Sequence, residues 1–214
     1  MIIAMSLPEI ATSAPPDVQA FNSQRITCDG IADWWSPKDF RLISSSPTLQ
    51  RKFEDGKINH LDPAISRMDD GNYNLNVIAD LDFLLRRWPN HYLALQALIK
   101  FEAGGGRTIS NRPAICYFEW ARRFAPDDVN VLILQGLYFY NKQDHAMAEA
   151  AWQSALQIDP GSPDAHYNLG LLYFGAGKFD DALKHGRAAY DSGFPLPGLK
   201  NKLVKAGQWT GDID

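Results

Sequence analysis

Cysteine is scarce in this chain of 214 residues, in which only Cys28 and Cys116 are present. Neither has a second thiol or a pair of histidines at metal-ligand spacing, so the sequence does not support a zinc site. One disulfide between the two cysteines remains open. We expect two free thiols, with Cys116 packed on a helix.

An excess of basic residues is also missing. The chain has 21 Lys and Arg against 25 Asp and Glu, a formal net charge of −4. This balance lacks the basic footprint of nucleic-acid-binding domains, so no nucleic acid is expected as a partner. No apolar run approaches the roughly 18 residues of a membrane-spanning helix, so no transmembrane segment is expected either. Hydrophobic residues make up 45% of the chain, enough for a sizeable core.

Motifs that carry chemistry are absent too: there is no nucleophile elbow, Walker loop, metal-ligand pair or dinucleotide fingerprint. The glycine-rich stretch Gly104–Arg107 follows a helix, whereas a phosphate cradle usually follows a strand, so we interpret it as a turn. Asp69 and Asp70 lack the alternating ligands of a calcium loop, and a turn with a helix cap is expected. The sequence therefore predicts no catalytic residue, no cofactor and no metal, and a protein that is not an enzyme.

The first residues, "MIIAMSLPEIATSAPPDVQ", have neither the basic start nor the long apolar stretch of a secretory signal. The segment "ATSAPPD" nevertheless resembles the small-residue end of such a signal. We expect a periplasmic or otherwise exported protein whose export is directed by residues upstream of this sequence. A cytoplasmic protein with a disordered tail is the alternative.

A period of 34 residues runs through the second half of the chain. Four pairs of matched residues share this spacing: Pro126 and Pro160, Gly136 and Gly170, Ala148 and Ala182, and Ala155 and Ala189. Apolar residues recur at helical spacing between them, which predicts two pairs of antiparallel helices. Pro160 and Pro163 interrupt the helices between pairs, because proline cannot continue a helix interior. Ser162 is the expected N-cap of the next helix, and Gly175 and Gly177 allow a tight turn.

These residues resemble the tetratricopeptide repeat (TPR) of bacterial-type proteins, most specifically over residues 129–190. The second unit carries the positions that the family pattern requires: Leu169, Gly170, Tyr173, Phe179, Ala182 and Ala189. Glycine on the first helix (A) and alanine on the second (B) let the two backbones approach closely. Gly186 departs from the pattern, which usually has a large residue there, and this weakens the packing expected of the last repeat.

The resemblance implies an all-α fold, a right-handed superhelix of about four antiparallel helix pairs. The expected repeats are residues 58–91, 92–128, 129–162 and 163–196, within a repeat region of 58–196. Residues 197–214 are expected to form a capping helix and tail, with Leu199 and Leu203 on one helical face. Residues 1–57 lie outside the period as a non-repeat segment, in which Trp34 and Trp35 suggest docking onto the array.

The resemblance also implies a function: a non-catalytic adaptor or assembly factor that binds another protein in a concave groove lined by the A helices. Carried over by position, the groove residues are Gln96, Lys100, Asn130, Ile133, Leu137, Tyr140, Asp164, Tyr167, Leu171 and Phe174. Tyr167, Leu171 and Phe174 share one helical face, and an exposed apolar patch is expected there.

Two other interpretations were weighed against this one. Among the positions that grip acidic C-termini in some relatives, only Lys100 and Asn168 supply donors, which argues against a carboxylate clamp. The alternative function is a structural subunit of a larger envelope or surface complex, with the groove filled by the chain's own N-terminal segment.

Overall fold

The computed structural model describes Cys28 and residues 37–108 and 112–209. Over these residues the chain is entirely helical, with no β-strand, which confirms the predicted fold class. They divide into two compact units, an N-terminal unit that ends at Leu134 and a C-terminal unit that begins at Gln135. The expected docking of Trp34 and Trp35, and the signal-like start of the chain, lie outside the described residues.

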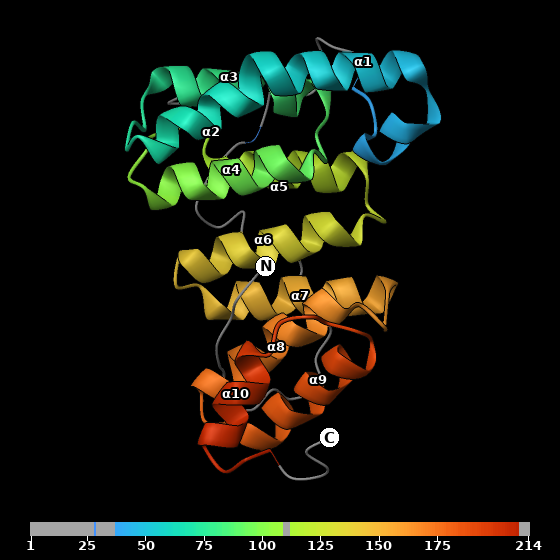
Figure 1. The fold of residues 1–214 in the computed structure, drawn as a ribbon, viewed down its shortest axis with the longest axis vertical. Helices are drawn as coiled ribbons and strands as arrows, with labels where there is room; N and C mark the ends of the chain where they lie inside the picture. The colour runs from blue at the N-terminus through green and yellow to red at the C-terminus, as the bar shows by residue number, and fades with distance from the viewer. Residues whose placement is uncertain (1–27, 29–36, 109–111, 210–214) are drawn as a thin grey trace. The chain divides into compact units, whose positions relative to one another are not determined.

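The N-terminal unit begins with a short 3₁₀-helix, η2 (Phe40–Ser45). A long helical run follows, composed of α1 (Pro47–Gly56), the π-helical segment η3 (Lys57–Leu61) and α2 (Asp62–Asp69). Next come α3 (Leu75–Arg87), α4 (Tyr92–Ala103) and α5 (Ala114–Phe124), with α4 and α5 both below α3 (Figure 1). The helical run from Pro47 to Asp69 crosses residue 58, where the sequence placed the start of the first repeat.

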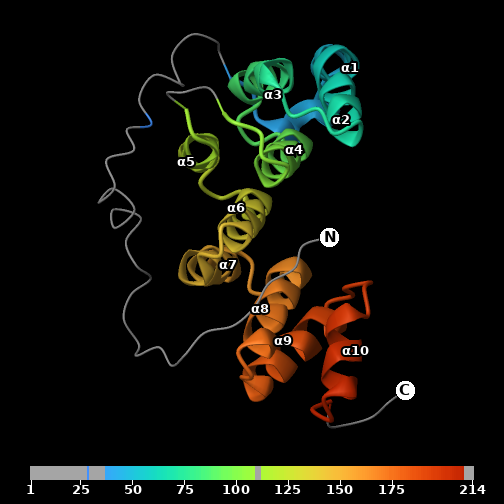
Figure 2. The same cartoon turned by 90° about the vertical axis from the view of Figure 1, so that its left-hand side faces the viewer.

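The C-terminal unit holds α7 (His145–Ile158), α8 (Pro163–Gly175), α9 (Phe179–Asp191) and α10 (Gly198–Lys205). Helix α6 (Val129–Asn141) precedes them. Helices α8, α9 and α10 pack against one another (Figure 2). Ser162 is the N-cap of α8, since its hydroxyl accepts a hydrogen bond from the Ala165 N–H at 3.4 Å, with Pro163 at the start of the helix. This confirms the predicted boundary.

The close approach of α8 and α9 depends on small residues. A Cβ atom built on Gly170 would lie 3.3 Å from the Ala182 carbonyl oxygen and 3.3 Å from the Gly186 nitrogen, so the two backbones nearly touch. Ala182 and Ala189 are fully buried at this contact. The turn between the helices places Gly177 at φ +74°, a conformation that favours glycine. The structure thus shows the predicted backbone approach at Gly and Ala between α8 and α9, whereas the equivalent Gly136 on α6 lies against the Trp152 side chain.

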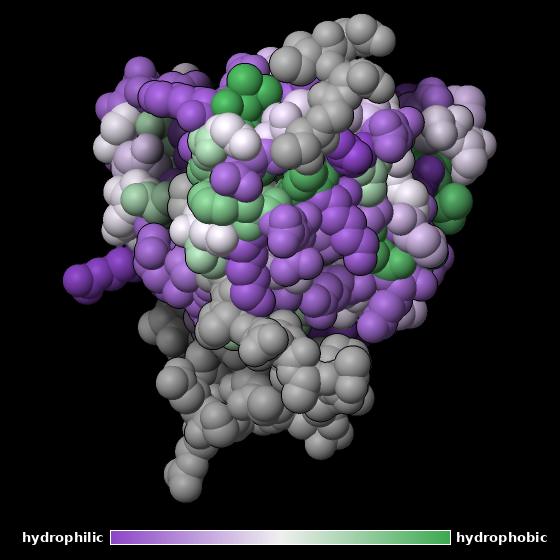
Figure 3. All heavy atoms as spheres, turned by 90° about the horizontal axis from the view of Figure 1, so that it is seen from below, coloured by the Kyte–Doolittle hydropathy of each residue, from purple (hydrophilic) through white to green (hydrophobic). Residues whose placement is uncertain are grey.

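Helix α10 packs on the last helix pair, as the spacing of Leu199 and Leu203 predicts. Both leucines are fully buried. A Cβ on Gly186 would lie 3.2 Å from the Leu199 Cδ2 atom, so Leu199 occupies the space that a large residue at position 186 would fill. The weakness expected at Gly186 is thus offset by a side chain from outside the period. Figure 3 views the side of α9 and α10, and that face is largely hydrophilic.

Residues 38–41 form polar contacts with the turns of the N-terminal unit. The Phe40 N–H donates to Asn90 Oδ1 at 2.8 Å. The Asn90 amide in turn donates to Asp39 at 2.8 Å and to the buried Asp128 at 2.7 Å. These partners lie at the turns before α4 and before α6. Asp39 and Phe40 are therefore bound to the turn before α4, and through Asn90 to the turn before α6.

Cys28 and Cys116 form a disulfide, with their Cα atoms 5.1 Å apart. The expectation of two free thiols was wrong. Cys116 is packed on a helix as expected, fully buried on α5. Its partner comes from a segment with no periodic pattern, so the sequence contained no signal that would bring the two together.

Candidate functional site

The predicted groove positions of the N-terminal unit are mostly in solvent. Gln96 and Lys100 are exposed on α4, and Asn130 is exposed at the start of α6. Lys100 forms an ion pair with Asp69 of α2. Ile133, by contrast, is only 4% exposed and belongs to the core, so its side chain lies away from any open surface.

Leu137 and Tyr140, further along α6, are half-buried. The Tyr140 ring lies 5.4 Å from the His145 ring and 6.5 Å from the Trp152 ring, centroid to centroid. Much of the Tyr140 ring is therefore engaged in packing against α7. Asp164 is half-buried at the start of α8, where its carbonyl oxygen accepts a hydrogen bond from the Asn168 amide at 2.8 Å.

The expected apolar patch on α8 is not open. Tyr167 is 2% exposed and Leu171 is 1% exposed. The Tyr167 ring stacks on Phe194, with centroids 4.0 Å apart and planes 24° apart. Phe174 is half-buried, and the Lys202 ammonium of α10 lies 5.8 Å from its ring centroid. The expectation of exposure was wrong because the segment after α9, which follows the last repeat, covers this face.

Asn168, one of the two donors considered for a carboxylate clamp, is fully buried. Its amide nitrogen is bonded within α8 to Asp164. The other donor, Lys100, is paired with Asp69. Both side chains already have partners inside the chain.

An uninterrupted stripe on α4 remains in solvent. Leu93, Gln96 and Lys100 stand at helical spacing on one face, and all three are exposed. Leu93 is 42% exposed, which is high for a leucine on a helix packed among others. Residues such as Ala94, Leu95 and Leu98 fill the opposite side and are fully buried. The stripe thus lies on a helix whose opposite side is packed in the core, and its apolar residue, Leu93, is not part of that core.

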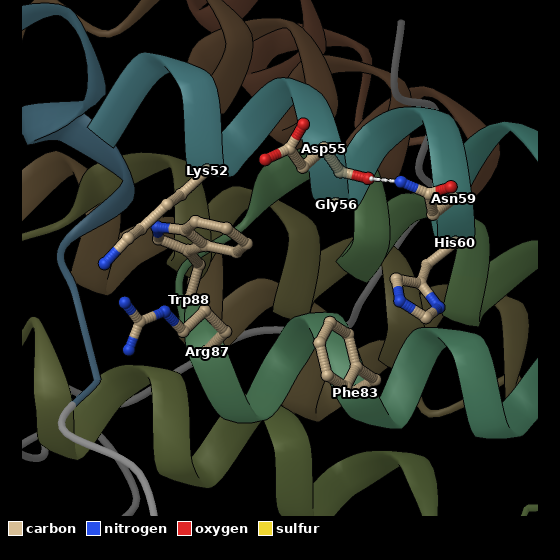
Figure 4. A pocket seen from close by; sticks show the side chains of 8 residues that line it. All are labelled: Lys52, Asp55, Gly56, Asn59, His60, Phe83, Arg87 and Trp88. Carbon is tan, nitrogen blue, oxygen red and sulfur yellow. Dashed lines mark hydrogen bonds between the residues drawn. The ribbon is translucent and has the colours of Figure 1, made fainter. Parts of the chain in front are cut away.

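A cleft of about 320 Å³ opens elsewhere in the N-terminal unit, between the α1–η3 run and α3 (Figure 4). Its lining residues are Lys52, Asp55, Gly56, Asn59, His60, Phe83, Arg87 and Trp88. A Cβ on Gly56 would lie 3.1 Å from both Leu84 Cδ2 and Trp88 Cζ3, so glycine lets α1 approach α3 at this point. The π-helical segment η3 forms part of the wall, and such segments often occur at functional sites.

Sequence reasoning missed this cleft because one of its walls, the α1–η3 run, crosses the boundary drawn at residue 58. A glycine inside an amphipathic stretch was the available signal: Gly56 sits within a helical run and is buried. Phe83 of α3 and Trp88, which follows it, lie outside the TPR pattern. Their positions in the repeat therefore did not indicate that they line a cleft.

Two histidines meet in the C-terminal unit, where the Nδ1 atoms of His166 and His185 lie 2.9 Å apart. The His166 Nε2 atom lies 3.0 Å from the Pro160 carbonyl oxygen, which can only accept, so Nε2 carries the proton. His185 must then donate from Nδ1 to His166. Burial, with a smaller effect from the nearby His166, lowers the pKa of His185 to about 4. The described residues hold no group of three or more His, Cys, Asp or Glu side chains that could bind a metal ion.

No helix within the described residues is both long and apolar enough to cross a membrane. Comparison with curated proteins gave no match. A family model for the tetratricopeptide repeat matches twice, over residues 114–163 and 133–195. Such repeats generally mediate protein–protein interaction and are typically non-catalytic. The matched range includes α8 and α9, whose backbones approach closely at Gly170 and Ala182, and residues 114–195 of the chain are therefore tetratricopeptide repeats.

Proposed function

We propose that the protein is a non-catalytic adaptor or assembly factor that binds a segment of another protein through its N-terminal unit. The observation that carries this proposal is the exposed stripe Leu93, Gln96 and Lys100 on α4, on a helix whose other side is fully packed. An exposed apolar residue with polar neighbours on a rigid helix is typical of a binding surface. Asn130, another residue predicted to line the groove, is also exposed in this unit.

The test is capture of binding partners by cross-linking and mass spectrometry with the wild-type chain and two variants. Leu93→Ser should weaken partner binding about tenfold, the loss typical of a modest interface hot spot. Ile158→Ser is the matched control, because Ile158 is an apolar residue of nearly the same exposure, 43%, on α7. If both variants retain the same partners with unchanged affinity, the α4 stripe is not the binding surface.

A structural subunit of a larger envelope or surface complex is the second candidate. It is favoured by one observation: the α8 face that a repeat protein would use for binding is occupied by the chain's own Phe194 and Leu199. In that case a convex or edge surface would contact the neighbouring subunits. A partner recovered only as a large stable assembly, insensitive to Leu93→Ser, would support this candidate over the first.

We also infer an exported protein, periplasmic or beyond. Support comes from the Cys28–Cys116 disulfide, since disulfides persist mainly in oxidising compartments. The measurement is thiol alkylation of the protein in intact cells followed by mass determination. Two alkylated cysteines in the protein as it occurs in the cell would argue for a reducing compartment and against this inference.

A further inference from the structure

The cleft between the α1–η3 run and α3 ends at a histidine whose tautomer is set by its neighbours. The His60 Nδ1 atom lies 2.8 Å from one carboxylate oxygen of Asp80. Arg67 donates to the other oxygen of Asp80 at 2.5 Å, and this ionised carboxylate can only accept hydrogen bonds. In a neutral His60 ring the proton is therefore on Nδ1, and the Nε2 atom has a lone pair.

The Nε2 atom of His60 is an acceptor that the described part of the fold does not use. No described residue donates a hydrogen bond to it, because the one hydrogen bond of the ring is made by Nδ1. The His60 side chain is 29% exposed, and its second ring nitrogen is turned toward the cleft (Figure 4). A ligand in the cleft can therefore donate a hydrogen bond to this atom.

The rest of the cleft is largely apolar. Phe83 is half-buried on the α3 wall and stacks on His60, with ring centroids 4.1 Å apart. Gly56 contributes no side chain to the opposite wall. Lys52 and Arg87 stand at the far end from His60 (Figure 4). A ligand in this space thus meets mainly carbon atoms along its length and one acceptor at the His60 end.

The size of the cleft and this arrangement of groups favour one aromatic side chain with a donor at its tip. At about 320 Å³ the cleft is at the low end of ligand sites, too small for a large cofactor. Tyrosine has a ring that packs favourably against aromatic neighbours, and its hydroxyl lies in line with the ring axis. With the ring against Phe83, the hydroxyl can point at the Nε2 atom of His60.

We propose that this cleft binds a tyrosine side chain of a partner protein. The tyrosine hydroxyl donates to the His60 Nε2 atom, and the ring packs against Phe83. Asp80 is a positioning residue, since it fixes the tautomer of His60. The inference rests on the proposed adaptor function only for the ligand being part of a protein. It adds a second surface, separate from the α4 stripe.

The experiment is long-range ¹H–¹⁵N NMR of the His60 ring nitrogens, assigned with the His60→Leu variant, at about pH 8, where imidazole is ordinarily neutral. In the free protein Nδ1 should carry the proton. N-acetyl-tyrosinamide and N-acetyl-phenylalaninamide are then titrated, two neutral probes that differ only by the hydroxyl. The tyrosine probe should bind about fivefold more tightly, the gain from one net hydrogen bond. It alone should move the Nε2 resonance toward that of a protonated nitrogen.

Three variants assign the preference to individual groups, with binding followed through the backbone amide resonance of Phe83. His60→Leu should abolish the preference, so that both probes bind equally. Asp80→Asn should reduce it, because the asparagine oxygen stays on Arg67 and its amide donates to Nδ1, which moves the histidine proton to Nε2. Asp55→Leu is the matched control: it removes the carboxylate in the cleft lining and should leave the preference unchanged.

A proton on Nε2 in the free protein would overturn the proposal. So would equal binding of the two probes to the wild type, no binding of either, a preference that survives in His60→Leu, or one that is lost in Asp55→Leu. The adaptor function is tested separately by Leu93→Ser, so either result can fail without the other.

Discussion

Leu199 is the residue whose removal tests the packing of the C-terminal unit most directly. It is fully buried, and its Cδ2 atom lies over Gly170 and Gly186 on α8 and α9. Leu199→Ala removes three carbon atoms at a site where two of the neighbours are glycines, which have no side chain to move into the space. Leu→Ala changes in cores cost about 2 to 5 kcal/mol. Because α10 is a short terminal helix that can shift, we expect about 3 kcal/mol.

A double-mutant cycle with Gly170→Ala makes this prediction specific. A Cβ on Gly170 would lie 2.4 Å from Leu199 Cδ2, so the single change should be destabilising by about 1 to 2 kcal/mol despite the helix-forming preference of alanine. In the Leu199→Ala background that clash is gone. The double variant should therefore be more stable than the sum of the two losses implies, by about 1 kcal/mol or more.

The assay is urea unfolding followed by circular dichroism, with the midpoint and slope fitted for each variant. Val204→Ala is the control on the same helix, because Val204 is 46% exposed and should change the free energy of unfolding by less than about 0.5 kcal/mol. Additive effects of Gly170→Ala and Leu199→Ala, within about 0.5 kcal/mol, would show that Leu199 does not fill the space between the two glycines.

Three further predictions follow from the described contacts. Ala148→Leu or Ala182→Leu should destabilise the fold by about 1 to 3 kcal/mol through overpacking of fully buried sites, and unchanged urea midpoints for both would contradict the repeat register. Paired Cys28→Ser and Cys116→Ser changes should cost about 2 to 4 kcal/mol, and reductant should lower the melting temperature of the wild type but not of this variant. Because the pKa of His185 is lowered to about 4, the unfolded chain binds the proton more readily, so stability is fully present above about pH 6.5 and falls as the pH drops toward 4. At about pH 5 the loss from this residue should be about 1 to 2 kcal/mol relative to pH 7, and an equally steep pH dependence in His185→Asn would refute the assignment.

The helices and their pairing could be predicted because the signals are local and repeated. Pro160, Ser162 and Pro163 determine where α7 ends and α8 begins through the geometry of a few bonds. Gly170 and Ala182 allow the backbones of α8 and α9 to approach, and Gly136 and Ala148 stand 34 residues earlier at the same positions of the preceding pair. Such signals do not depend on what lies elsewhere in the chain.

Contacts made by segments outside the period could not be predicted in this way. Position in the repeat indicated which side of α8 carries Tyr167 and Leu171, but not that Phe194 and Gly198 would lie against Tyr167. The Cys28–Cys116 disulfide depends likewise on the path of a segment without periodic pattern. The cleft at Trp88 needs the close approach of α1 to α3 at Gly56, which no spacing in either helix specifies.

The covering of Tyr167 bears on where a partner can bind. Phe194 and Leu199 belong to the same chain as α8, so they compete for this face at an effective concentration of the order of millimolar or above. A partner segment would have to displace both side chains and expose the fully buried Leu199, which costs about 1.5 to 3 kcal/mol in lost burial alone. The stripe on α4 requires no such displacement, because Leu93 is already in solvent. If the proposed adaptor function holds, a partner at ordinary cellular concentration would therefore bind the α4 stripe at a lower free-energy cost than the covered face of the last repeat.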